Sequence, residues 1–245
     1  MSNPWLVRLG RPSWPRVRLV CIPQSGGGPA TFRPLTTSLP SDIDVLALRP
    51  PGRESRRGEP PVRCMDDLIK AALEAIDEDA GLPLALFGYC SGAFAMTELA
   101  REIVRAGHPR MVRLFACAAC SPAQADRDRQ VHAMPEPELR DYLRAFGVMP
   151  GEILDEADLF ALFEPVIRAD FETWETSPFL PGPPLPVPIT AIGGRTDPVL
   201  EFSELTEWQH HTAAEFTLRL FPGGHDFFTT GVQALGAAIA ADLLA

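Results

Sequence analysis

Short apolar segments recur along this chain, and stretches with the spacing of amphipathic helices separate them. The segments end in turn-forming residues such as Gly26-Gly27-Gly28 and Pro50-Pro51-Gly52. Buried apolar strands that alternate with helices are typical of a parallel sheet covered on both faces. We therefore predict an α/β protein with a mostly parallel sheet and helices on both faces. The predicted strands are Val17–Pro23, Val45–Leu48, Leu84–Tyr89, Val112–Ala119, Ile189–Gly193 and Thr217–Phe221.

The predicted helices form two groups. The first group alternates with the strands: Asp66–Glu78, Ser91–Ala106 and Thr229–Leu244. The second lies between about residues 121 and 180, where the alternation stops and the sequence is acidic: Pro135–Phe146, Glu152–Phe163 and Glu164–Trp174. We predict that this second group is a helical lid inserted over one end of the sheet. The stretch Pro181–Pro188 that follows is either a rigid return to the sheet or a ligand for SH3-type domains, and the first is the simpler interpretation.

Length and charge narrow the class of protein. An α/β fold of 245 residues is expected to form one domain over residues 1–245. The net charge of -10 argues against nucleic-acid binding, which requires a basic surface. No apolar run approaches the roughly 20 residues that cross a bilayer, and no hydrophobic segment of a signal peptide stands at the start. We expect a cytoplasmic monomer that binds neither nucleic acid nor membrane.

The five cysteines are an odd number in a chain too large to need disulfide bonds, which predicts reduced thiols. Cys117 and Cys120 form a C-x-x-C pair. Because no second pair accompanies it and it follows an apolar strand, we interpret it as packing and not as a metal or redox site. No metal site is expected.

The segment Gly88-Tyr89-Cys90-Ser91-Gly92 lies between a predicted strand and a predicted helix. It matches the G-x-nucleophile-x-G turn, in which glycines let the strand and helix approach and the nucleophile projects from a strained backbone. The nearby helix N-terminus favours a thiolate. The segment therefore predicts Cys90 as a nucleophile. The alternative is a cysteine packed in a glycine-rich turn, and Ser91 lies outside the nucleophile position of the pattern.

In folds with this turn, an acid and then a histidine follow the nucleophile along the chain. Asp197 follows the predicted strand Ile189–Gly193, and His225 follows Thr217–Phe221. Both are therefore expected at the same end of the sheet as Cys90, which predicts a Cys90–His225–Asp197 triad. The candidates that this order disfavours are His108, His132, His210, His211 and Asp226.

A glycine-rich loop, Pro23–Gly28, follows the first predicted strand. It lacks the spacing of phosphate-binding loops. In this fold the oxyanion formed during acyl transfer is bound by the backbone N–H of the residue after the nucleophile and by one from an early loop. We predict Ser91 and Ser25 as these donors. The triad and this loop together predict an α/β-hydrolase fold with acyl-transfer chemistry.

Further segments occur in the order seen in a known family: Ile22–Gly27, Arg49–Arg53, Phe87–Gly92, Pro165–Phe171, Pro188–Gly194 with Asp197, and Leu218–His225. With them the chain resembles the type II thioesterases of polyketide and nonribosomal peptide biosynthesis. The resemblance implies an α/β-hydrolase fold with a helical lid and no cofactor. It also implies a carrier protein as partner and acyl or peptidyl thioesters on its phosphopantetheine arm as substrates, which are hydrolysed to clear stalled carriers.

The chain departs from that family at two places. The family usually has His-Ser where this chain has Tyr89-Cys90, and His-Ala where it has Gln24-Ser25. A cysteine gives a thioester acyl-enzyme, which keeps most of the activation of the substrate, and free cysteine is already partly ionised at neutral pH. Transfer of the acyl group to water, to an amine or to a hydroxyl, including cyclisation, therefore all stay open.

Two other functions are compatible with parts of the sequence. The elbow around Cys90 also resembles that of dienelactone hydrolases, another cysteine branch of this fold, but that match is confined to the elbow. A binding protein without activity would be expected to lack a triad residue, and none is missing. The thioesterase hypothesis accounts for more of the chain than either alternative.

The partner and the acyl group leave weaker signals. Carrier proteins are generally acidic, so an acidic chain would need a local basic patch to dock one. The arginines are either such a patch or ordinary solvated surface: Arg49, Arg53, Arg56, Arg57, Arg127 and Arg129. The lid aromatics are either core or the wall of an acyl channel: Phe160, Phe163, Phe171 and Trp174.

Overall fold

The structure is a computed structural model that describes residues 3–10, 12–77, 81–107, 111–147, 149–225 and 227–245. His108, Asp226 and the predicted end of a helix at Glu78 lie outside these residues. Within them, no helix is long and apolar enough to cross a membrane.

The described strands form one sheet in the order β1-β3-β2-β4-β5-β6-β7. Only β1 runs antiparallel to its neighbour, so the prediction of a mostly parallel sheet is confirmed. β1 was not predicted; it is a three-residue edge strand in which Leu6 pairs with Leu48. The strands are β1 Leu6–Arg8, β2 Val17–Ile22, β3 Ile43–Leu48, β4 Leu84–Tyr89, β5 Met111–Cys117, β6 Ile189–Gly194 and β7 Phe216–Phe221.

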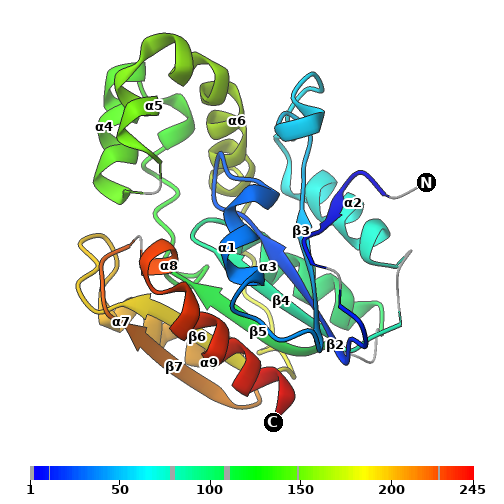
Figure 1. The fold of residues 1–245 in the computed structure, drawn as a ribbon. Helices are drawn as coiled ribbons and strands as arrows, with labels where there is room; N and C mark the ends of the chain where they lie inside the picture. The colour runs from blue at the N-terminus through cyan, green and yellow to red at the C-terminus, as the bar shows by residue number, and fades with distance from the viewer. Residues whose placement is uncertain (1–2, 11, 78–80, 108–110, 148, 226) are drawn as a thin grey trace.

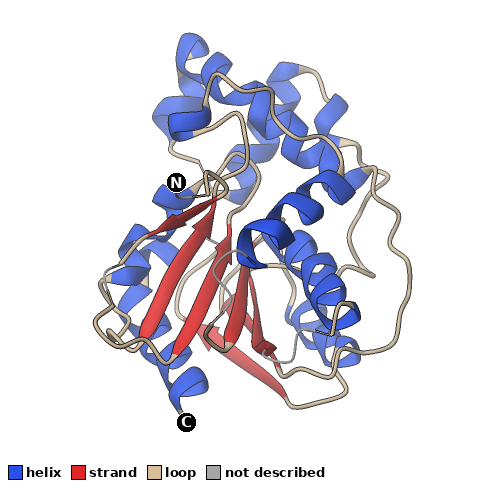
Figure 2. Ribbon diagram, turned by 90° about the vertical axis from the view of Figure 1, so that its right-hand side faces the viewer, coloured by secondary structure: helices blue, strands red, loops and turns tan. Residues whose placement is uncertain are grey.

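Every residue of β2, β3, β4 and β6 is buried, as expected for strands covered on both faces. One apolar cluster joins the sheet to α2 (Met65–Asp77), α3 (Gly92–Arg105) and the short helices α7 (Phe202–Thr206) and η4 (Glu207–His211). A second joins the other face to η1 (Pro29–Phe32), α1 (Arg33–Thr36), α8 (Phe227–Thr230) and α9 (Val232–Leu244). The helices therefore cover both sides of the sheet (Figure 2).

The inserted segment is helical, as predicted, and stands over one end of the sheet (Figure 1). It contains η3 (Val131–Ala133), α4 (Glu136–Phe146), α5 (Gly151–Asp155) and α6 (Ala157–Glu175). The predicted boundary between two helices at residues 163 and 164 is wrong, because α6 continues through Pro165. Pro165 leaves the carbonyl of Ala161 without a helical partner, and Ala161 is exposed, so water can satisfy it.

Candidate active site

Cys90 lies on the turn between β4 and α3, at a backbone φ of 50°. This left-handed conformation is strained for a residue with a side chain, and it persists only where the surroundings impose it. The Cys90 N–H donates to the carbonyl of Cys117 in the neighbouring strand at 2.8 Å, and the Cys90 carbonyl accepts from Ala93 N–H at 2.9 Å. The sheet and the helix thus fix the turn from both sides, and the thiol projects into a cavity at its tip.

The two glycines of the turn are required by close packing. A Cβ on Gly88 would lie 2.5 Å from the Cα of Ala93 in α3. A Cβ on Gly92 would lie 2.4 Å from the carbonyl oxygen of Ile22 at the end of β2. Both neighbours are backbone and cannot move aside, which is the physical cause of the G-x-C-x-G spacing.

The structure brings the predicted acid and histidine together. His225 follows β7 and Asp197 follows β6, and Asp197 Oδ2 accepts a hydrogen bond from His225 Nδ1 at 2.8 Å. Asp197 Oδ1 accepts from the N–H groups of Val199 at 2.9 Å and Leu200 at 3.2 Å. The side chains of His225 and Asp197 are only 4% and 1% exposed. Asp197 is therefore held by its own loop and in turn orients the imidazole.

The other ring nitrogen of His225, Nε2, is buried and has no hydrogen-bond partner among the described residues. Burial lowers the pKa of His225, but the hydrogen bond that the imidazole donates to Asp197 and the proximity of Cys90 outweigh it and raise this pKa to about 10. The imidazole is thus set up to carry a proton beside the thiol.

A cavity of about 250 Å³ opens beside Cys90 and His225. The aromatic part of its apolar wall comes from α3 and the lid: Phe94, Tyr142, Phe146, Phe171 and Trp174. Its polar lining residues include Gln24, Gln124, Asp126, Arg129 and Glu204. A mostly apolar pocket with a few polar groups is the usual form of a small-molecule site.

Three of the four lid aromatics have one of the two predicted roles, core or channel wall, and Phe163 has neither. Phe171 and Trp174 line the cavity. Phe160 is fully buried with the Arg140 guanidinium 4.5 Å from its ring centroid, and Phe163 is exposed. The sequence did not reveal that Phe94, Tyr142 and Phe146 line the cavity. An amphipathic pattern indicates an apolar helix face, but it does not indicate whether that face contacts the core or a cavity.

Phe146, at the end of α4, packs on His225. Its ring meets the imidazole of His225 edge to face, with centroids 5.3 Å apart and an interplanar angle of 89°. Tyr142, one turn earlier, contacts Phe146 with centroids 4.7 Å apart. The lid therefore covers the histidine as well as the cavity.

The two residues predicted to supply the oxyanion donors are hydrogen-bonded to each other. In the structure the Ser25 N–H donates to Ser91 Oγ at 2.8 Å, and the two hydroxyl oxygens are also 2.8 Å apart. The Ser91 hydroxyl thus occupies the position where an oxyanion would meet the Ser25 amide. Binding of an oxyanion there requires this hydroxyl to rotate away.

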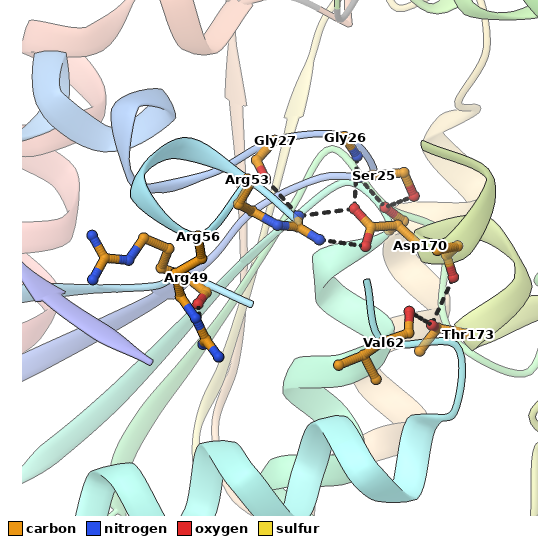
Figure 3. Close-up of polar contacts among 11 residues, drawn as sticks. Ser25, Gly26, Gly27, Arg49, Arg53, Arg56, Val62, Asp170 and Thr173 are labelled. Carbon is orange, nitrogen blue, oxygen red and sulfur yellow. Dashed lines mark hydrogen bonds and ion pairs between the residues drawn. The ribbon is translucent and has the colours of Figure 1, made fainter. Parts of the chain in front are cut away.

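Two of the four arginines after β3 contradict both interpretations, docking patch and solvated surface, whereas Arg57 is exposed. Arg53 and Arg56 are only 7% and 9% exposed, so they are neither a docking surface nor solvated residues. Arg53 pairs with Asp170 of the lid at 2.7 Å (Figure 3). Arg56 pairs with Glu59, three residues further along the chain, at 2.6 Å. Sequence spacing gave no sign of the Arg53–Asp170 pair, because Asp170 is far along the chain.

Arg127 and Arg129 also have intramolecular roles. Arg127 donates to the carbonyls of Ser177 and Pro122. Arg129 lines the cavity, with its guanidinium 5.6 Å from the centroid of the Tyr142 ring.

All five cysteines are free thiols. Burial raises the pKa of Cys21 and Cys117, and it raises that of Cys120 to about 12. Cys120 lines the cavity beside Cys90 but stays a neutral thiol at physiological pH. Within the cavity, the thiol with a histidine beside it is that of Cys90.

The family described as Thioesterase domain matches residues 17–242. The chain belongs to the thioesterase family. It is 30% identical to the gramicidin S biosynthesis protein GrsT of Aneurinibacillus migulanus over 225 residues, which cover 92% of this chain and 88% of GrsT. The match over nearly the whole chain favours this family over the dienelactone hydrolases.

Solved structures agree. The thioesterase RedJ from the prodiginine pathway of Streptomyces coelicolor has a TM-score of 0.88 and 31% identity, covering 95% of this thioesterase and 92% of RedJ. The type II thioesterase BorB of the borrelidin cluster has a TM-score of 0.85 and 32% identity, covering 99% and 97%. The α/β-hydrolase fold and the resemblance to type II thioesterases are confirmed, and the role of Cys90 as nucleophile stays a prediction.

Proposed function

We propose that this thioesterase acts on acyl or peptidyl thioesters on the phosphopantetheine arm of a carrier protein, and that it releases the product by hydrolysis through an acyl-enzyme on Cys90. The observation that carries the proposal is the Cys90 thiol on a strained turn, in one cavity with His225, which Asp197 orients. The relatives GrsT and RedJ belong to gramicidin S and prodiginine biosynthesis, which supports a carrier-bound substrate.

In the first half-reaction the Cys90 thiolate adds to the thioester carbonyl, whose oxygen takes up the electron pair. The backbone N–H groups of Ser91 and Ser25 bind this oxyanion after the Ser91 hydroxyl rotates away. When the intermediate collapses, the bond to the pantetheine sulfur breaks. His225 supplies the proton that the leaving thiolate takes. Burial lowers the pKa of His225, but Asp197 and Cys90 raise it to about 10, so the imidazole holds this proton until the thiol leaves.

In the second half-reaction the now neutral His225 removes a proton from a water molecule as its oxygen attacks the acyl-enzyme. The same N–H groups bind the second oxyanion. Collapse breaks the bond to the Cys90 sulfur, releases a carboxylic acid and restores the thiolate–imidazolium pair. The chain's own residues supply each proton transfer in this scheme, and no cofactor is invoked.

A second candidate is transfer of the acyl group to an amine or hydroxyl, including ring closure. One chemical argument and one contact favour it. A thioester acyl-enzyme on Cys90 would remain activated toward amines. Phe146 covers His225, which limits the approach of water to the imidazole. This activity uses the same first half-reaction and differs only in the acceptor.

Product analysis tests the proposal. Acyl-pantetheine thioesters serve as carrier surrogates, with free thiol and acid followed separately. We expect hydrolysis by the native protein, loss of it in Cys90→Ala, and its retention in the neighbouring control Ser91→Ala. Release of acid by Cys90→Ala at the native rate would contradict the cysteine mechanism, and an amide formed from an added amine in place of acid would favour the second candidate.

A further inference from the structure

A buried ion pair joins the lid to the segment after β3. Arg53 NH1 and NH2 donate to the two carboxylate oxygens of Asp170 at 2.9 and 2.7 Å, in the two-pronged geometry of a strong arginine–carboxylate pair (Figure 3). Arg53 is in the segment after β3 and Asp170 is on α6, and their side chains are 7% and 19% exposed. The pair thus connects two distant parts of the chain in a region with little solvent.

Both charged groups also bind the backbone of the glycine-rich loop. Gly26 N–H donates to Asp170 Oδ2 at 2.8 Å, and Arg53 NH1 donates to the carbonyl of Gly27 at 2.7 Å (Figure 3). Gly26 has φ 76°, and a Cβ there would lie 2.6 Å from Cγ1 of Ile167, one turn before Asp170 on α6. The loop is therefore pressed against the lid helix and held there by directional hydrogen bonds.

The residue before Gly26 is Ser25, whose backbone N–H is a proposed oxyanion donor. The Ser25–Gly26 peptide group ends in the N–H that Asp170 binds, so Asp170 restricts the backbone rotation that links this peptide to the Ser25 amide. On its other side the Ser25 amide points at Ser91 Oγ, beside the nucleophile. Asp170 thus acts one residue away from the donor.

Stability alone does not account for a pair of this kind. Burying two charges costs solvation, and apolar side chains of similar volume are often equally stabilising. Arg53 Nε is buried without a hydrogen-bond partner among the described residues, so this site is not fully satisfied. The more exposed pair Arg63–Glu172 already joins the same segment to α6 without touching the loop. What Asp170 and Arg53 add is orientation of the loop backbone.

We propose that Asp170, held by Arg53, is a positioning residue for the oxyanion hole. The same helix contributes Phe171 and Trp174 to the acyl cavity, so α6 links the wall that contacts the acyl group to the donor that binds its oxyanion. This inference rests on the proposed function, because it concerns attack by Cys90.

A trifluoromethyl ketone analogue of an acyl-pantetheine thioester reports on this donor. The Cys90 sulfur adds to the ketone carbon and the oxygen takes the electron pair, and no group leaves. The ¹⁹F resonance of the adduct then gives the pKa of the new hydroxyl, which a well-placed oxyanion hole lowers. The variants are Asp170→Asn and Arg53→Lys, and the control is Glu172→Gln, which cuts the more exposed pair.

We expect the adduct pKa to rise by about one unit in Asp170→Asn, with kcat for hydrolysis reduced about tenfold or more and KM within about twofold. Glu172→Gln should leave kcat and KM within about twofold of native and the adduct pKa within about 0.3 unit. If Asp170→Asn does not fold, Arg53→Lys, which keeps the charge and loses the fork, should show the same changes.

The outcomes separate the two proposals. No adduct on Cys90 in the native protein would refute the cysteine mechanism and this inference with it. If the folded variants form the adduct with an unchanged pKa, keep the native kcat for hydrolysis and differ only in a lower melting temperature, the positioning role alone is refuted.

Discussion

Replacing Asp197 by asparagine separates the orientation of His225 from the folding of the loop. Asp197 accepts three hydrogen bonds, one from His225 Nδ1 and two from the N–H groups of Val199 and Leu200. An asparagine keeps one oxygen for the two backbone donors. It then places its NH₂ group against Nδ1, which must become an acceptor and cannot stay protonated. The imidazole is left with the wrong tautomer and without the carboxylate that favours its charge.

The expected effect on rate is large and the effect on stability is modest. In a serine triad the same change costs about 10⁴-fold in kcat, which is an upper bound here because a cysteine depends less on its base. We expect Asp197→Asn to slow acylation about 10²-fold or more. Because the two backbone donors keep their acceptor, the free energy of unfolding should fall by only about 1–2 kcal/mol.

Asp197→Ala provides the comparison. It leaves both backbone N–H groups and Nδ1 without acceptors at a site that is 1% exposed, and loss of one partner of a buried pair costs about 3–5 kcal/mol. Rapid-mixing acylation with a chromogenic thioester and urea unfolding of both variants measure the two effects. Acylation by Asp197→Asn within about threefold of the native rate would refute the orienting role of Asp197.

Three more predictions concern the same site. Burial lowers the pKa of His225, but Asp197 and Cys90 raise it to about 10, so the protonated imidazole persists above neutrality. The acylation rate should therefore decline as the pH rises through about 10. A decline near pH 7 in a stopped-flow pH profile would contradict this. Ser91→Ala frees the Ser25 N–H, so acylation seen by intact mass should stay within about threefold of native. Phe146→Ala removes an edge-to-face contact with His225 worth about 0.5–1.5 kcal/mol and opens the imidazole to water. The ratio of acid to amide formed with an added amine should therefore rise, and an unchanged ratio would argue that Phe146 does not shield His225 from water.

Much of the fold follows from short-range patterns. Strands β2 to β7 are mostly apolar, and they stand out without knowledge of their neighbours. The edge strand β1 does not, because three residues carry no periodicity and form a strand only when Leu48 and its neighbours are in place. The continuity of α6 through Pro165 likewise depends on an exposed carbonyl at Ala161, which sequence alone does not reveal.

The site was predictable where it follows from chain order. Cys90, His225 and Asp197 come after strands whose ends share one edge of the sheet, so the topology alone brings them together. Arg53 and Asp170 meet through the folding of the lid over the loop, and nothing in their spacing specifies this contact. The local cluster of arginines therefore suggested surface residues, as a docking patch or as solvated side chains, where Arg53 forms an internal ion pair.

The identity of the acylated residue tests the central claim most directly. The native protein is mixed with an excess of acyl-pantetheine thioester, quenched in acid within milliseconds and digested with pepsin, and the peptides are sequenced by mass spectrometry. We predict one acyl group on Cys90, absent in Cys90→Ala and present in Ser91→Ala. An acyl group on Ser91, or turnover of the thioester with Cys90 never modified, would contradict the account.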